Sequence, residues 1–121
     1  MDINKLKNVL DDHSFYLDLN FLMNVLSDAA IANDIKNTGD EIKRLWEGVK
    51  RQSELTGSAE KELKSWLQSY YELLDNLLTK YPNVIKDPAA KSRFEDLKRR
   101  MEDILKEFEK EGVWKEVRLR R

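Results

Sequence analysis

Apolar residues in the last long segment of the chain recur at spacings of four and three positions, the period of one face of an α-helix. This apolar set is Ala90, Phe94, Leu97, Met101, Ile104 and Phe108. Asp87 is placed to cap the helix, Pro88 suits its first position, and Gly112 suits its end. The pattern predicts a bundle helix over residues 88–111 that buries an a/d seam.

Three earlier segments share this helical period. They predict helices near residues 14–37, 40–56 and 58–81. Thr38 and Glu41 fit a capping box at the start of the second of these, although a helix that continues through Gly39 stays open as the alternative. Ser58 fits the cap of the third. Only four glycines and two prolines interrupt the 121 residues. With short turns between the helices, the sequence predicts an all-α fold, an antiparallel four-helix bundle.

The N-terminal residues leave the start of the first helix open. Asp2 can cap a short extra helix at the N-terminus. The residues from Asp11 to Ser14 either interrupt this helix or lie within one continuous helix. If they interrupt it, Ser14 caps the helix that follows. We assign residues 1–112 to a single helical-bundle domain and residues 113–121 to a short basic C-terminal tail.

The balance of charges limits the classes of partner. The formal net charge is −1, which gives no global field to recruit nucleic acid, so we expect no nucleic-acid partner. Residues 1–37 carry a net charge of −3, and the last nine residues carry +3. A basic chain end of this kind can touch phosphates or a membrane surface, but it is more often simply solvated.

The segment between Asn8 and Ile35 contains no lysine or arginine, and thirteen of the eighteen residues from Phe15 to Ala32 are apolar. Polar residues at helical spacing, Asp18 and Asp28 among them, argue against a membrane span, because one charge at a bilayer centre costs about 2.5–3.5 kcal/mol. The segment is therefore either the central helix of the bundle or a surface kept for a partner.

No chemistry-bearing motif accompanies this segment. His13 is the only histidine, and a calcium-loop frame fails because Lys36 and Leu45 occupy ligand positions. Glycine-rich phosphate loops and cysteines are absent, and the start of the chain lacks the features of a signal peptide. We therefore expect a soluble, non-enzymatic protein without a metal or cofactor, cytoplasmic if it is natural.

Residues 31–46 resemble the death-motif helix of pro-apoptotic Bcl-family proteins, which places hydrophobic anchors in a groove of a partner. The resemblance implies four anchors: Ile31, Ile35, Thr38 and Ile42. It also implies that Gly39 allows close approach of the groove and that Asp40 pairs with an arginine of the partner. Thr38 departs from the family pattern, since a large apolar residue is expected there.

The whole chain resembles a computationally designed helical bundle. Lysine- and glutamate-rich surfaces, the absence of cysteine, short connections and regular caps are typical of that class. The asparagine-rich segment from Phe15 to Asn37 departs from it. Such a departure is expected if a binding helix has been set into an idealised scaffold.

Three functional hypotheses remain open. The first is protein–protein interaction, or self-association, through the apolar helix around residues 15–42. The second is a small-molecule or cofactor pocket within the bundle, with sparse polar groups from His13, Tyr16, Asn20, Asn24 and Trp66. The third is a bundle with no partner beyond itself. The exposure of the apolar segment in the folded protein distinguishes the first from the third.

Overall fold

The computed structural model describes residues 2–55 and 57–110, and these residues are predominantly helical. The all-α prediction is confirmed, since the described residues form only two isolated β-bridges, Asp2 with Glu54 and Leu26 with Ile85. The elements in chain order are α1 (Asn4–Leu10), the 3₁₀ helix η1 (His13–Phe15), α2 (Leu19–Val25), α3 (Ala29–Val49), α4 (Gly57–Thr79), the 3₁₀ helix η2 (Pro82–Val84) and α5 (Pro88–Phe108).

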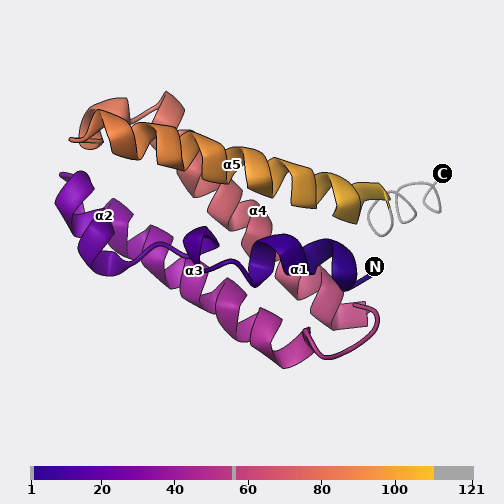
Figure 1. The fold of residues 1–121 in the computed structure, drawn as a ribbon. Coiled ribbons are helices and arrows are strands. Elements are labelled where there is room, and N and C mark those ends of the chain that lie inside the picture. Colours follow the sequence, from indigo (N-terminus) through magenta and orange to yellow (C-terminus); the bar gives the residue numbers. More distant parts are fainter. Residues whose placement is uncertain (1, 56, 111–121) are drawn as a thin grey trace.

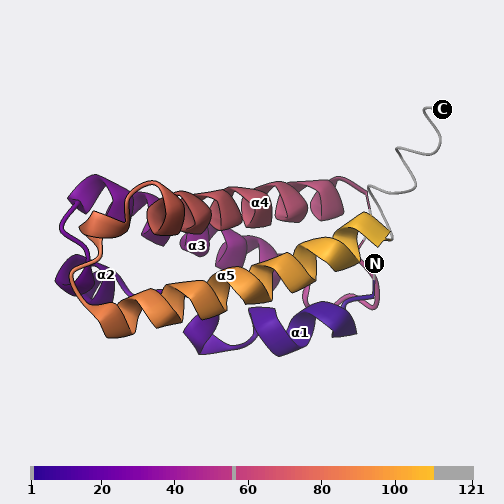
Figure 2. The same ribbon diagram turned by 90° about the horizontal axis from the view of Figure 1, so that it is seen from above.

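Three long helices carry the fold, and they alternate in direction along the molecule (Figure 1). Helix α4 packs against both α3 and α5. The short elements α1, η1 and α2 run along the side between α3 and α5 (Figure 2). The Trp46 indole of α3 donates a hydrogen bond to Asp11 at 2.6 Å, and Arg100 of α5 pairs with Asp12 at 2.8 Å.

The predicted helices 14–37 and 40–56 are wrong in their bounds. The chain is helical through Gly39, and the break comes earlier, at residues 26–28. Asp28 caps α3 by accepting hydrogen bonds from the backbone of Ala30 and Ile31 at 2.9 and 3.1 Å. The Thr38–Glu41 capping box is also wrong, because the Thr38 hydroxyl donates to the Asp34 carbonyl within α3.

A backbone pairing fixes the break before α3. The amide of Ser27 donates to Val84 at 2.8 Å, and that of Lys86 donates to Val25 at 2.7 Å. The Ser27 amide and the Val25 carbonyl are satisfied by these bonds, whereas in a continuing helix they would be satisfied by bonds within that helix. A contact between residues separated by almost sixty positions therefore ends α2, and local helical periodicity gives no sign of it.

Residues 11–14 do interrupt the first helix, one of the two alternatives that the sequence left open. Ser14 does not cap a long helix there. Instead Asp12 caps η1 by accepting from the Ser14 amide at 2.9 Å, and Asp18 caps α2 by accepting from the Asn20 amide at 3.3 Å. The first helix is thus replaced by three short elements, each too short to be stable without packing.

The last two predicted helices agree with the structure more closely. The predicted bounds 58–81 compare with 57–79 for α4, and 88–111 compare with 88–108 for α5. Asp87 accepts from the Ala89 amide at 3.0 Å, and Pro88 begins α5, as predicted. All six residues of the predicted a/d seam are buried. The predicted stop at Gly112 and the tail 113–121 lie outside the described residues.

The core connects the broken N-terminal segment to the long helices through Tyr70. This side chain of α4 is fully buried, and its hydroxyl donates to the Phe15 carbonyl at 3.0 Å. The two rings also meet edge to face, with centroids 5.6 Å apart. A buried carbonyl in an irregular segment needs such a donor, because water does not reach it.

We expect Tyr70→Phe to lower the free energy of unfolding by about 1–3 kcal/mol, because it leaves the buried Phe15 carbonyl without this donor. Urea denaturation followed by circular dichroism measures the change. Tyr71→Phe is the matched control, since its hydroxyl bonds Glu102 at a partly exposed position and its loss is expected to cost about 0.5 kcal/mol or less. Equal losses in the two variants would contradict this role for Tyr70.

Candidate functional site

The predicted groove-binding anchors face the core of the protein itself. Ile35 and Ile42 are 1% and 0% exposed, Thr38 is 7% exposed, and Ile31 is half-buried. Asp40 lies on the opposite, solvent side of α3, where Lys36 pairs with it at 2.6 Å. In this structure, then, contact of a partner with Ile35 or Ile42 requires α3 to separate from the bundle.

The space beside Gly39 is occupied by the protein itself. A Cβ atom at this position would lie 3.6 Å from the Tyr70 hydroxyl and 3.7 Å from the adjacent ring carbon. Gly39 therefore lets α4 approach α3 closely enough for Tyr70 to reach the N-terminal segment. The close approach that the Bcl-family resemblance assigns to a partner groove is made within the chain.

Much of the lysine-free apolar segment is buried as well. Phe15 is inaccessible, and Tyr16 and Phe21 are half-buried. Met23 is exposed to 45% and is the large apolar side chain of α2 that faces solvent. The segment thus contributes mainly to the core, and this burial removes the main support for a partner surface built from the apolar residues of this segment.

The five residues of the predicted pocket do not converge. His13, Asn20 and Asn24 are exposed on two different short elements. The Tyr16 hydroxyl donates to the Leu10 carbonyl at 2.7 Å, and burial raises the pKa of this phenol, with further help from nearby carboxylates. Trp66, half-buried on α4, lines a groove between α3 and α4.

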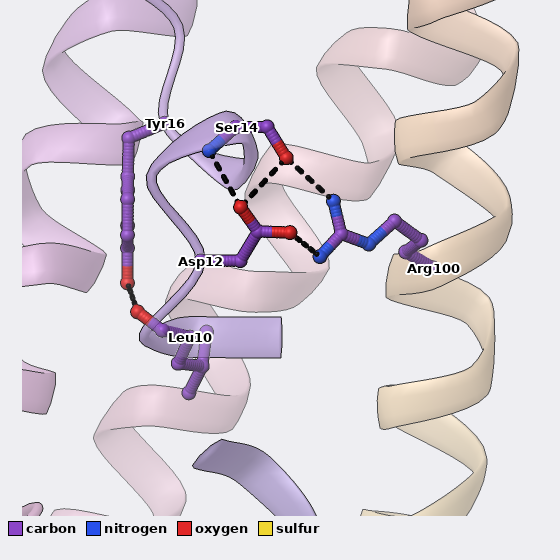
Figure 3. Close-up of polar contacts among 5 residues, drawn as sticks. All are labelled: Leu10, Asp12, Ser14, Tyr16 and Arg100. Atoms are coloured by element: carbon purple, nitrogen blue, oxygen red, sulfur yellow. Dashed lines mark hydrogen bonds and ion pairs between the residues drawn. The ribbon is translucent and has the colours of Figure 1, made fainter. Parts of the chain in front are cut away.

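Beside His13, a polar cluster joins the N-terminal segment to α5 (Figure 3). The Ser14 hydroxyl donates to Asp12 at 2.9 Å and accepts from Arg100 at 3.1 Å. A second nitrogen of Arg100 bonds the other Asp12 oxygen at 2.8 Å. Every polar atom of the Asp12 carboxylate is thus used to hold the chain in place. The cluster is a structural clip, with no free nucleophile or base.

A groove of about 420 Å³ lies between α3 and α4 and is here called the α3–α4 groove. Its lining from α3 is Asp34, Asn37, Thr38 and Glu41, and its lining from α4 is Trp66, Ser69, Glu72, Leu73 and Asn76. On each helix these residues recur at three- and four-residue spacing beside the buried stripe. They form two facing rows because α3 continues through Gly39.

The lining of the α3–α4 groove combines apolar and acidic side chains. Trp66 and Leu73 are half-buried and supply apolar surface. Three carboxylates line it, and no lysine or arginine does. Glu41 is engaged by Arg44 at 2.7 Å, whereas Asp34 and Glu72 form no ion pair with another described residue. The groove therefore presents uncompensated negative charge next to an aromatic surface.

Sequence reasoning found Thr38 and Trp66 but assigned them to different sites, and it missed the two free carboxylates. The signal was present: Asp34, Thr38 and Glu41 fall on one line of a helix that spans Gly39. That line is lost once a helix break is placed at residue 38 or 39.

Comparisons with known proteins give no relative. No family model matches the chain, and neither the curated proteins nor the solved structures give a match. Within the described residues, no cluster of three or more potential metal ligands is found, and none of the helices has the length and apolarity of a bilayer span. The site is therefore interpreted from its own geometry.

Gly39→Ala is expected to stabilise the protein by up to about 1 kcal/mol, because alanine is the better helix residue and the added Cβ meets Tyr70 at an ordinary contact distance. Gly39→Leu, by contrast, is expected to cost about 1–3 kcal/mol through collision with Tyr70. Thermal unfolding measures both. The matched pair is Gly48→Ala and Gly48→Leu, since nothing lies within 4 Å of a Cβ there. A harmless Gly39→Leu would show that α3 and α4 are farther apart.

The clip gives a pH-dependent prediction. Bonds from the Ser14 amide, the Ser14 hydroxyl and Arg100 lower the pKa of Asp12 below its ordinary value of 3.8. A carboxyl with a lower pKa in the folded state stabilises that state above its ordinary pKa, and this contribution is lost as the pH falls through the lowered value. Wild type is therefore expected to exceed Asp12→Asn in unfolding free energy at pH 7.

The difference between wild type and Asp12→Asn should shrink when urea denaturation is repeated below pH 3.8. Asp103→Asn, on the exposed side of α5, serves as the control with the same change of charge. A difference that stays constant from pH 7 to pH 2 would mean that the charge of Asp12 contributes nothing to the clip.

Proposed function

We propose that this protein is a non-enzymatic binding protein that holds a short basic segment of a partner protein in the α3–α4 groove. The observation that carries the proposal is the pair of carboxylates without ion-pair partners, Asp34 and Glu72, beside the half-buried Trp66. Exposed like charges placed around one groove are not explained by stability. A cationic ligand relieves the repulsion between the two carboxylates and is attracted by both of them.

The lining defines the chemistry of the partner segment. An aromatic face with carboxylates at its edge favours lysine or arginine, since the ring attracts a cation and the carboxylates accept its hydrogen bonds. The apolar surface of Trp66 and Leu73 suits one aliphatic or aromatic side chain of the ligand. The amides of Asn37 and Asn76 can bond the ligand backbone. The preferred ligand is therefore an apolar residue flanked by basic ones.

This proposal keeps the predicted class of function and changes the surface. The interaction still involves the helix that carries residues 31–42, but through its outward row of Asp34, Asn37 and Glu41 instead of Ile31, Ile35 and Ile42. We further propose that the fold is an antiparallel four-helix bundle in which the short elements of residues 2–26 take the place of the first helix. That arrangement leaves the outer sides of α3 and α4 uncovered.

We expect a fluorescein-labelled peptide that alternates lysine with leucine around one tryptophan to bind the protein. Asp34→Lys combined with Glu72→Lys should weaken the binding by roughly tenfold or more, because attraction becomes repulsion. Fluorescence anisotropy at two salt concentrations measures it, and the affinity for wild type should fall with salt.

The matched control is Glu95→Lys combined with Asp103→Lys, which makes the same change of net charge on the exposed side of α5. This variant should bind the peptide almost as wild type does. If both double variants lose binding equally, the peptide recognises overall charge and the groove is not the site. If wild type does not bind the peptide at all, the proposed function is wrong.

A further inference from the structure

The connection between α4 and α5, at one end of the bundle, carries positive charge that the fold does not compensate (Figure 1). Residues 80–86 contain Lys80 and Lys86 and no acidic residue. Both lysines are exposed, and neither forms an ion pair with another described residue. Tyr81, next to Lys80, is exposed to 51% and is one of two large hydrophobic side chains that face solvent in the described part of the chain. The connection therefore offers an aromatic residue beside a cation, the composition that the α3–α4 groove favours.

Lys80 continues the row of α4 residues that line the groove. Ser69, Leu73 and Asn76 line it, and Lys80 follows at the next four-residue step. The Lys80 amide donates to the Asn76 carbonyl at 2.8 Å, so the last helical turn still includes this residue. One face of α4 therefore carries the lining of the groove and, at its C-terminal end, a cation without an ion-pair partner among the described residues.

The charges on this face of α4 are complementary to themselves under a two-fold rotation. Glu72 and Lys80 are eight positions apart, which is a rise of about 12 Å, and Asn76 lies midway between them. A two-fold axis through Asn76 places Lys80 of each copy opposite Glu72 of the other, with the two α4 helices antiparallel. The Asn76 amides then meet at the axis, where each can donate to the other and accept from it. A closed dimer requires a self-complementary patch of this kind.

We propose that a second copy of this chain binds at the α3–α4 groove, with Lys80 of each copy beside Asp34 and Glu72 of the other. Tyr81 then lies near the level of Leu73 of the other copy, where it adds apolar contact. Within one molecule Glu72 and Lys80 stand two helical turns apart, too far for an ion pair, so association between copies compensates charges that the single molecule leaves unpaired. This inference rests on the proposed function of the groove and names a partner for it. A foreign basic segment must displace the second copy before it binds.

Sedimentation equilibrium of the full chain over a range of protein concentrations should show a reversible monomer–dimer equilibrium that weakens as salt is added. Lys80→Glu should raise the dissociation constant of the dimer by about tenfold or more, because both symmetry-related contacts become repulsive. The charge-exchanged variant Lys80→Glu, Glu72→Lys should recover most of the association, which a variant that has merely lost its fold cannot do. Lys91→Glu makes the same change of charge at an exposed site of α5 and should dimerise as wild type does.

The peptide of the preceding test separates the two proposals. Added peptide should convert the dimer to monomer, because peptide and second copy compete for the same groove. A chain that stays monomeric at every concentration and still binds the peptide would overturn the self-association while the groove function stands. A dimer that is insensitive to Lys80→Glu, or is not recovered by the charge exchange, would also overturn it, since its interface would lie elsewhere. If the Lys80→Glu variant, whose groove is free, does not bind the peptide, the groove function itself is wrong.

Discussion

The hydrogen bond from Tyr70 to the Phe15 carbonyl is the constraint on which most of the fold depends. It joins the middle of α4 to a segment that has little regular structure of its own. It also requires a small residue at position 39, because Tyr70 lies within 3.6 Å of where a Cβ atom would stand on α3. This phenol therefore helps to hold three elements together, and it helps to explain why a broken, lysine-free N-terminal segment stays packed where a long helix would otherwise lie.

The sequence was sufficient to predict helix starts and buried faces where these depend on residues close together in the chain. The cap at Asp87 and the seam of α5 follow from short-range rules, and both were predicted correctly. The helices of the first forty residues were not predicted correctly, because their ends depend on distant contacts such as the Ser27–Val84 bond. Asp18 and Asp28 were read as polar residues within a helix, although each stands directly before a helix as its cap.

The candidate site was less predictable than the fold for the same reason. To predict a groove between two helices, one must know which face each helix turns toward the other. The assumed helix break beside Gly39 removed one of the two rows that face each other. The aromatic residue Trp66 could be selected from the sequence, since a tryptophan on a helix face is either core or contact surface. Its acidic neighbours could not, because Asp34 lies 32 positions away in the sequence and charged residues are common on helix surfaces.

Two sets of acidic residues in the described part of the chain have different physical roles. Asp12, Asp18 and Asp28 each accept a backbone N–H at the start of a helix, so their charge is compensated within the fold. Asp34 and Glu72 have no such partner among the described residues and line the same groove as the half-buried Trp66. A carboxylate that contributes nothing to a cap or ion pair is left available for a ligand. The division is the physical basis for the binding proposed at the α3–α4 groove and for the structural role of the N-terminal clip.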